Sequence, residues 1–271
     1  MKKITESRAM SRFENKIAII TGAASGIGAA TLKRFLKEGS IVICCDINDA
    51  LGEKLTSQMG DRAIYRHCDV GKLDQLESAV NFALSEFGGL DIMMNNAMYS
   101  TGGPIHQIDP IEWNKSINIM LNAVFYGTRA ALPAMIKRGG GSIINTASIE
   151  AFGGEMFASP YTTAKAGVVN FTKNTAIEYA RLGIRANAIC PGIVETPLFL
   201  RMDAGATRTR EEMENLSPMG RLIQPAEIAA VVAFLASDDA SAITGEAIVV
   251  DAGTTAMLNL GGTPPLSPSD F

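Results

Sequence analysis

Tyr161 and Lys165 lie four positions apart in a segment with helical periodicity, so their side chains share one face of the expected helix. Ser148 follows a short β-branched run and precedes this pair. A free tyrosine has a pKa of about 10, and we expect the Lys165 ammonium to lower it by favouring the phenolate. Tyr161 is therefore the candidate general acid and base, and Ser148 is the candidate hydrogen-bond donor to the reacting oxygen.

A glycine-rich turn marks a second candidate site, between the first expected strand and the first expected helix. Glycines permit positive φ and close approach of the backbone, and a helix N-terminus favours a pyrophosphate. Such a turn can be purely structural, but its position directly after a first strand predicts a dinucleotide site. The candidate cofactor-binding residues of the turn are Gly22, Ser25, Gly26, Ile27 and Gly28.

Polar residues at the ends of the next strands extend this site. Asp46 ends the second strand, where its carboxylate can accept both ribose hydroxyls and repel a 2′-phosphate. No Arg or Lys stands in the glycine turn or in the three positions after Asp46, so we expect NAD rather than NADP. Asp69 and Val70 follow as candidates for the adenine end, and Asn96 and Ala97 end the fourth strand at the same edge.

The elements that must position these residues alternate regularly along the chain. Several β-branched runs are apolar at consecutive positions, which is typical of a parallel sheet covered on both faces. The alternation predicts a doubly wound, Rossmann-like α/β fold with a mostly parallel seven-stranded sheet. The expected strands are 16–21, 41–46, 63–69, 90–95, 142–146, 184–190 and 247–251. The expected helices are 26–38, 50–59, 73–87, 110–137, 161–181 and 225–236.

The length of 271 residues and the absence of a Pro/Gly/Ser-rich linker favour one domain, over residues 14–256. Residues 1–13 are expected to be an N-terminal extension and residues 257–271 a proline-rich C-terminal tail. Residues 192–224 carry no clear strand pattern, so we expect a substrate-binding insertion there. Within it, we expect residues 198–213 to form a lid of helices that closes over the substrate.

Composition excludes several functional classes. Apolar residues make up 47% and charged residues 19%, which excludes a disordered chain. The net charge of −4 without a basic stripe argues against nucleic-acid binding. The four cysteines form no CxxC pair and there are two histidines, so we expect no metal site and no disulfide framework.

Targeting signals are also missing from the pattern. Residues 1–16 contain no apolar signal segment, and the longest apolar run, 228–235, is far shorter than the ~20 residues that span a bilayer. The cysteine usage fits a reducing compartment. We therefore expect a cytoplasmic protein without a membrane partner.

Taken in order, these residues resemble the short-chain dehydrogenase/reductase family, in its compact single-domain branch, over residues 14–255. The motifs that carry the resemblance are Thr21-Gly22-x3-Gly26-x-Gly28, Asp46, Asp69, Asn95-Asn96-Ala97, Asn118, Ser148, Tyr161-x3-Lys165, Pro191-Gly192 and Thr196. The resemblance implies that Lys165 also holds the nicotinamide ribose, and that the positively charged nicotinamide joins the lysine in lowering the pKa of Tyr161. It further implies that Asn118, by itself better explained by capping or helix packing, holds a water that continues the proton relay.

The resemblance also implies a role in cofactor binding for the segment after the sixth strand, and it implies that several copies of the chain associate. Pro191, Ile193 and Thr196 would hold the nicotinamide carboxamide. The helices at 110–137 and 161–181 and the last strand would form the interfaces of a homotetramer or homodimer. Helix residues available for that packing are Ala130, Ala131, Val168, Phe171 and Ala176.

The expected substrate pocket is apolar, which favours a hydrophobic secondary alcohol or its ketone. Met98 stands where the family usually has glycine after Asn-Asn-Ala, so it either narrows the pocket or fills a core gap. Glu150 is the one charged candidate, either for a second substrate hydroxyl or as a solvated rim carboxylate. The candidate pocket residues are Met98, Ile149, Glu150, Met156, Phe157, Ile193, Leu198, Phe199 and Met202.

The sequence thus predicts an NAD-dependent alcohol dehydrogenase with Tyr161 as general acid and base. One alternative is a dinucleotide-sensing or scaffold protein on the same fold, against which the complete set of Asn118, Ser148, Tyr161 and Lys165 argues. A second alternative is an enoyl reductase or a sugar epimerase. The first usually spaces tyrosine and lysine more widely, and the second usually has a longer chain, so neither fits well.

Overall fold

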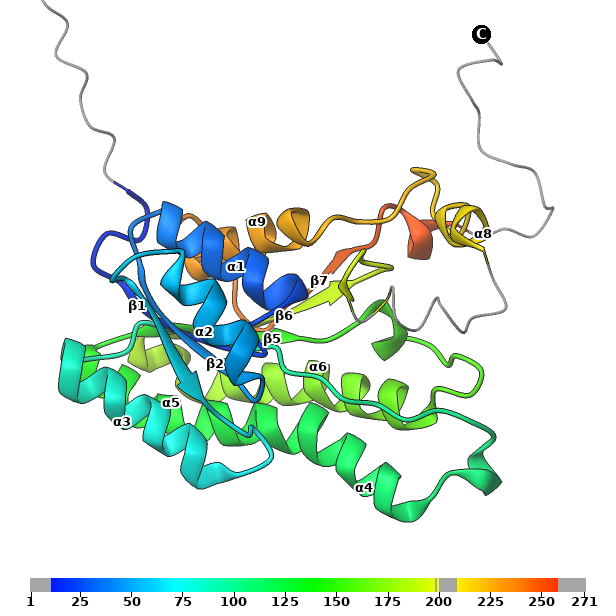
Figure 1. Cartoon of the computed structure of the whole chain (residues 1–271), viewed down its shortest axis with the longest axis horizontal. Helices are drawn as coiled ribbons and strands as arrows, with labels where there is room; N and C mark the ends of the chain where they lie inside the picture. The colour runs from blue at the N-terminus through cyan, green and yellow to red at the C-terminus, as the bar shows by residue number, and fades with distance from the viewer. Residues whose placement is uncertain (1–10, 198, 200–208, 258–271) are drawn as a thin grey trace, which may run out of the picture.

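The structure is a computed structural model that describes residues 11–197, 199 and 209–257. Seven strands form one sheet in the order β3-β2-β1-β4-β5-β6-β7, and every neighbouring pair is parallel (Figure 1). The expectation of a doubly wound, Rossmann-like sheet is confirmed, with all of its pairs parallel. The strands are β1 Ile17–Thr21, β2 Ile41–Asp46, β3 Ala63–His67, β4 Ile92–Asn95, β5 Gly141–Thr146, β6 Ile184–Pro191 and β7 Ala247–Val250.

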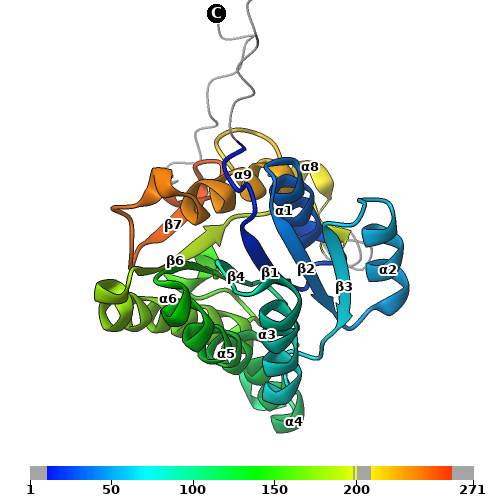
Figure 2. The same cartoon turned by 90° about the vertical axis from the view of Figure 1, so that its left-hand side faces the viewer.

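Helices cover both faces of this sheet, as Figure 2 shows. Alternate residues of β1 divide between two apolar clusters, because successive side chains in a strand point to opposite faces. Ala18 and Ile20 pack with α1 (Gly26–Lys37) and α9 (Pro225–Ala236). Ile17 and Ile19 pack with α3 (Leu73–Phe87) and α5 (Ala123–Arg138). The other helices are α2 Asp49–Ser57, α4 Pro110–Ile117, α6 Ser159–Tyr179 and α8 Arg210–Glu214.

The stretch expected as one helix over 110–137 is interrupted. Between α4 and α5, residues Asn118–Asn122 form a π-helical segment, and such segments often mark functional positions. The Asn118 amide donates a hydrogen bond to the Gly71 carbonyl (3.2 Å) and accepts one from Asn122 (3.2 Å). The π-helical segment therefore starts at Asn118, the residue that the sequence analysis names as a candidate for the proton relay.

Helical residues expected to pack against a partner divide into two groups. Ala131, Val168 and Ala176 are fully buried within this subunit, so that expectation is wrong for them. Their side chains lie on the helix faces that cover the sheet. Phe171 is half-buried and its ring packs edge-on against the ring of Phe125, which is exposed on α5.

Two segments outside the regular elements pack on the domain. Phe13, which the sequence places in the N-terminal extension, is buried against Phe35 with 4.8 Å between ring centres. In the region 192–224, Val194 forms an isolated bridge with Ile223, and α8 starts at a capping box of Thr209. The described residues contain one helical stretch, Pro110–Arg138, that is long and apolar enough to span a membrane, and 56% of its apolar window is buried in the fold.

Candidate active site

The carboxyl ends of β1, β4 and β5 are tied together by Asn96. Its side-chain amide donates to the carbonyls of Thr21 (3.0 Å) and Gly22 (3.2 Å), and its Oδ1 accepts from the Thr146 hydroxyl (3.2 Å). The Thr21 hydroxyl in turn accepts the backbone N–H of Asn96 (2.8 Å) and of Ala97 (3.2 Å). This network holds the glycine turn against the neighbouring strand ends, which explains why an asparagine is needed here.

The glycine turn is too tight for side chains. Gly22 has a φ of +62°, and a Cβ there would lie 2.8 Å from the Cα of Ala97. A Cβ on Gly28 would lie 2.2 Å from the Gly22 carbonyl oxygen. A Cβ on Gly26 would lie 3.3 Å from the Thr196 methyl group, so the turn also meets the segment that follows β6. The structure therefore brings together three parts of the predicted cofactor site.

The start of α1 has the features of a phosphate site. Ser25 precedes the helix and makes no side-chain capping bond. Within the described part of the chain, the backbone N–H groups of Gly26, Ile27 and Gly28 have no acceptor. Unpaired N–H groups at a helix N-terminus are suited to a pyrophosphate. The residues present thus fit a dinucleotide, which this turn and helix would hold.

Asp46 is fixed at the end of β2, beside the glycine turn. One carboxylate oxygen accepts the Ala24 N–H and the other accepts the Asn48 N–H, each at 3.0 Å. Both oxygens keep lone pairs for further donors. Asp69 accepts the Gly71 N–H (3.0 Å), and Val70 beside it is buried.

Lys165 is buried beside the end of β5. Its ammonium donates a hydrogen bond to the Thr146 carbonyl at 2.7 Å, and its side chain is almost wholly inaccessible. Burial lowers the pKa of Lys165 to about 8, while Cys190 and Glu150 act in the opposite direction. An ammonium in such a place needs further partners, because burying a charge is costly.

The phenol of Tyr161 does not have the lowered pKa that the sequence suggested. Burial raises the pKa of Tyr161 to about 12, although the Ser148 side chain acts to lower it. Lys165 Nζ lies 5.5 Å from the centre of the Tyr161 ring and donates its hydrogen bond elsewhere. Desolvation of the phenolate is therefore the largest effect on the pKa of Tyr161. The lowering expected from the lysine together with the nicotinamide stays a prediction.

The turn that starts after Ser148 and the segment that starts at Asn118 both pack against α6, which carries this pair. Ser148 is buried directly after β5, and its Oγ accepts the Glu150 N–H at 3.1 Å, which leaves its hydroxyl hydrogen available as a donor. Asn118 belongs to the π-helical segment that packs against α6, where a Cβ on Gly167 would lie 3.0 Å from Leu121. The Asn118 amide points to Gly71, so its part in a proton relay stays a prediction.

The segment after β6 closes on the same edge. Pro191 is the last residue of β6 and pairs with Val250, and the carbonyl oxygen of Ile193 accepts the N–H of Ile223 (3.0 Å). The Thr196 hydroxyl accepts the Phe199 N–H at 3.2 Å. These residues lie where the family resemblance places the nicotinamide, and their contact to it stays a prediction.

The predicted pocket residues are more exposed than expected. Met98, Met156 and Phe157 are 39%, 76% and 55% exposed, so they are open to solvent, and we refer to these three side chains as the apolar rim. Phe157 has a φ of +64°, and its carbonyl accepts the Gly103 N–H at 2.8 Å, which ties the loop after β4 to the loop before α6. Phe199 is half-buried, and Leu198 and Met202 lie outside the described residues.

Sequence reasoning missed Cys190, which is buried behind the catalytic set. Its thiol is fully inaccessible, and burial raises its pKa to about 11. The neutral thiol therefore fills space beside Lys165 rather than carrying charge. A single cysteine inside an apolar strand has no spacing signal by which it could have been found.

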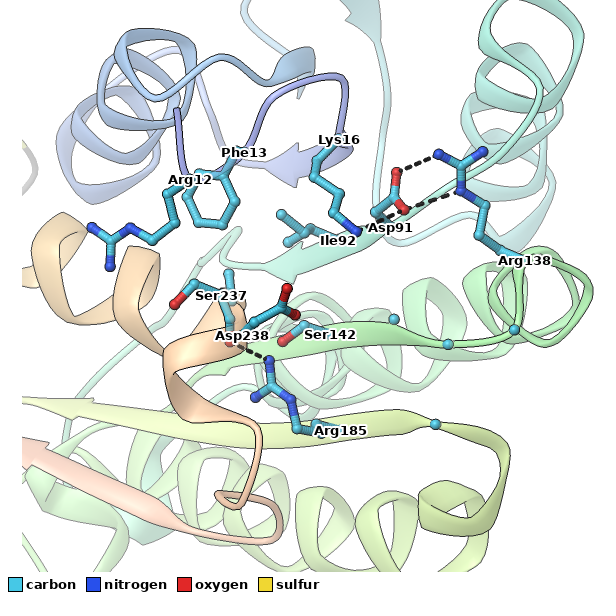
Figure 3. A pocket seen from close by; sticks show the side chains of 15 residues that line it. Arg12, Phe13, Lys16, Asp91, Ile92, Arg138, Ser142, Arg185, Ser237 and Asp238 are labelled. Carbon is cyan, nitrogen blue, oxygen red and sulfur yellow. Dashed lines mark hydrogen bonds and ion pairs between the residues drawn. The ribbon is translucent and has the colours of Figure 1, made fainter. Parts of the chain in front are cut away.

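A separate cavity of about 380 Å³ lies at the opposite, amino edge of the sheet (Figure 3). Its most buried charge is Asp91, which accepts the Ile17 N–H (2.9 Å) and two bonds from Arg138 (3.0 and 3.2 Å). The Lys16 ammonium lies 3.7 Å from the same carboxylate. This group joins the starts of β1 and β4 to the end of α5.

The other cations of that cavity are paired as well. Arg185 donates to the carbonyls of Leu235 (2.7 Å) and Ser237 (2.9 Å) at the end of α9, where carbonyl groups carry partial negative charge. Arg12 binds Glu38 through two nitrogens, at 2.7 and 3.0 Å. The cations here are occupied in structural contacts, so this cavity is not the candidate active site. No cluster of three metal-ligating side chains occurs among the described residues.

Comparison with known proteins decides the family. A family model described as enoyl-(acyl carrier protein) reductase matches residues 22–255, which include the glycine turn, the Tyr161–Lys165 pair and β7. The chain belongs to the short-chain dehydrogenase/reductase family. The dehydrogenases of this family use nicotinamide dinucleotides, and the glycine turn described above fits such a cofactor.

Curated relatives match over nearly their whole length. A cyclohexanol dehydrogenase from Acinetobacter sp. is 40% identical over 261 residues, which cover 94% of this chain and 99% of the relative. A meso-2,3-butanediol dehydrogenase from Serratia marcescens is 36% identical, with 90% and 96% covered. A 3-oxoacyl-[acyl-carrier-protein] reductase from Thermotoga maritima is 37% identical, with 89% and 98% covered. The chain is thus similar to oxidoreductases that act on CH–OH groups.

Proposed function

We propose that this protein is an NAD(H)-dependent oxidoreductase that interconverts a hydrophobic secondary alcohol and its ketone. The observation that carries the proposal is the convergence of Ser148, Tyr161 and Lys165 beside the glycine turn. The similarity to a cyclohexanol dehydrogenase and to a butanediol dehydrogenase supports an alcohol as substrate. The apolar rim of Met98, Met156 and Phe157 supports a hydrophobic one.

When bound, the nicotinamide ring supplies the site that accepts or gives the hydride. Tyr161 removes the hydroxyl proton during oxidation and returns it during reduction. Ser148 donates its hydroxyl hydrogen to the substrate oxygen and stabilises the charge that develops there. Lys165, with a pKa of about 8, is mostly protonated at neutral pH and stabilises the phenolate. Asn118 holds a water that passes protons to Lys165.

NAD rather than NADP follows from Asp46 in this proposal. Its carboxylate is held by two backbone N–H groups in a position where it accepts ribose hydroxyls. A 2′-phosphate there would meet that charge, and neither the glycine turn nor the three positions after Asp46 offers a compensating Arg or Lys. Val70 and Asp69 would then flank the adenine.

The experiment is a screen of cyclic and linear secondary alcohols with NAD⁺ and with NADP⁺, followed by NADH or NADPH absorbance. We expect turnover of a neutral hydrophobic alcohol with NAD⁺ at a kcat/KM at least about tenfold above that with NADP⁺. Tight NADH binding without turnover of any alcohol would instead favour the alternative, a dinucleotide-sensing or scaffold protein.

We also propose that the protein is a cytoplasmic homotetramer or homodimer. Phe125 on α5 is 46% exposed, and Phe234 on α9 and Val249 on β7 are more than a third exposed. Apolar side chains at these two places support two interfaces. Sedimentation equilibrium tests the assembly, and a monomer at micromolar concentration would contradict it.

A further inference from the structure

Glu150 is an acidic residue placed directly beside the proposed chemistry. It belongs to the short 3₁₀ turn Ile149–Ala151, which follows Ser148 and packs against α6. Its backbone N–H donates to the Ser148 Oγ (3.1 Å), so its position is fixed relative to that hydroxyl. Its side chain is half-buried, and among the described residues no side chain forms a hydrogen bond or ion pair with its carboxylate.

The charge of Glu150 reaches the reacting groups. Its turn packs against α6, the helix that carries Tyr161 and Lys165, and its charge acts to raise the pKa of both side chains. Burial and then the nearby carboxylate of Glu155 raise the pKa of Glu150 itself, whereas Lys165 lowers it. Within the described part of the chain, Lys165 is the one cation that acts on this carboxylate, and its ammonium is committed to the Thr146 carbonyl.

The substrate side of the site therefore carries two carboxylates and apolar side chains. Met156 and Phe157 continue the same loop from Glu155 toward α6 and offer no charge to an anion. A substrate with its own carboxylate would meet like charge in a partly desolvated place, where charge interactions are stronger than in water. A neutral alcohol of the same shape meets no such repulsion.

We propose that Glu150, assisted by Glu155, selects neutral alcohols against alcohols that carry a carboxylate. The proposal rests on the proposed alcohol dehydrogenase function and deepens it, because it names the charge class of the substrate. Glu150 is thus a specificity-determining residue. Its selectivity comes from repulsion of the wrong substrate as well as from apolar contacts to the right one.

A matched pair of substrates tests this proposal. We compare 4-hydroxycyclohexanecarboxamide with 4-hydroxycyclohexanecarboxylate, which have nearly the same shape and differ by one charge. For the wild-type protein with NAD⁺ at about pH 8, above the ordinary range of a carboxyl group, we expect kcat/KM to favour the amide by about tenfold or more.

Substitution of the acidic residues sharpens the test. Glu150→Gln keeps the backbone bond to Ser148 and removes the charge, so we expect the amide-to-acid ratio to fall by about five- to tenfold. Glu155→Gln is expected to lower the ratio by about twofold, because this side chain is exposed and its charge is screened. Glu178→Gln, on the exposed far part of α6, is the control and leaves the ratio unchanged.

Two outcomes separate this proposal from the proposed function. Turnover of the amide and the acid at equal rates by the wild type, or an unchanged ratio in Glu150→Gln, overturns the charge selection and leaves the dehydrogenase function intact. Absence of turnover with every alcohol overturns the proposed function. In that case, calorimetric titration of the two corresponding 4-oxo compounds into the protein with NADH still measures the selectivity, and equal affinity or no binding of either overturns it.

Discussion

The two edges of the sheet hold similar numbers of charged side chains but use them differently. At the amino edge, Asp91 accepts three hydrogen bonds and Arg185 donates to carbonyls at the end of α9 (Figure 3). At the carboxyl edge, Lys165 is buried with the Thr146 carbonyl as its hydrogen-bond partner, Tyr161 is half-buried, and the Glu150 carboxylate has no side-chain partner among the described residues. The amino edge holds the cavity of about 380 Å³, yet the chemistry that we propose lies at the carboxyl edge.

The comparison teaches that polar groups without hydrogen-bond partners identify the candidate active site better than the presence of a cavity does. Buried polar groups are normally satisfied, and those that are not need a ligand, a water or a catalytic role. At the amino edge the pairing is complete enough to explain every cation as a structural contact. At the carboxyl edge, the backbone N–H groups of Gly26, Ile27 and Gly28 at the start of α1 have no acceptor among the described residues.

Of the substitutions Lys165→Met, Asp91→Asn and Asp46→Ser, we expect the first to give the largest effect. It removes a proposed catalytic group from the carboxyl edge and leaves the amino edge unchanged. We expect kcat/KM for the best alcohol to fall by about 10²–10⁴-fold, the usual contribution of a group that supports general acid–base catalysis. Steady-state kinetics with NAD⁺ measures this. Activity within tenfold of wild type would show that Lys165 is only a packing residue.

The same variant gives a prediction for stability. The pKa of Lys165 is lowered to about 8 from its ordinary value of 10.5. The unfolded chain therefore binds more protons between these pH values, so this group makes wild-type stability rise with pH across the window. At about pH 7 we expect the free energy of unfolding of Lys165→Met to be about 1–3 kcal/mol higher than that of the wild type. Denaturant titrations should show this difference shrinking toward pH 10.

Asp91→Asn is the corresponding test of the amino edge, where we expect stability to fall and the kinetics to stay nearly unchanged. It removes the charge that pairs with Arg138 and Lys16, and we expect a loss of about 2 kcal/mol of unfolding free energy, since Arg138 is partly exposed to solvent. We expect kcat and KM to stay within about twofold of wild type under conditions where the variant is folded. A large change in kcat with normal stability would show that the amino edge takes part in function.

Asp46→Ser gives the smallest of the expected effects. We expect the ratio of kcat/KM with NAD⁺ to that with NADP⁺ to fall by about tenfold, because ribose acceptors are lost and repulsion of the 2′-phosphate is removed. Asp61→Ser, at an exposed turn before β3, is the matched control. An unchanged ratio in Asp46→Ser would mean that another residue sets the cofactor preference.

Much of the fold followed from the sequence because its signals are local. The apolar runs in β1 and β2 and the proline at the start of α9 determine strand and helix positions to within one or two residues. The π-helical segment at Asn118 was not predictable, because its apolar spacing is that of a continuous helix. The short helix α8 falls at the end of the segment 198–213, where we expect a lid of helices, but its bounds were not predictable, since a helix of one turn has no detectable period.

The site was predictable as a set of residues but not in its electrostatics. Spacing placed Tyr161 and Lys165 on one face, and strand ends placed Asp46 and Asn96 at one edge. The direction of the Tyr161 pKa depends on burial by several elements, which sequence spacing does not encode. The same holds for the Asn96 network, whose partners lie on β1 and β5.

The most direct measurement compares the wild type with Tyr161→Phe for two quantities, NADH formation from a neutral cyclic secondary alcohol and the dissociation constant for NADH. The substitution removes one hydroxyl from the carboxyl edge and leaves the glycine turn unchanged. We predict a loss of turnover of at least about 10³-fold with NADH affinity within about threefold of wild type. Turnover retained by Tyr161→Phe would contradict the account.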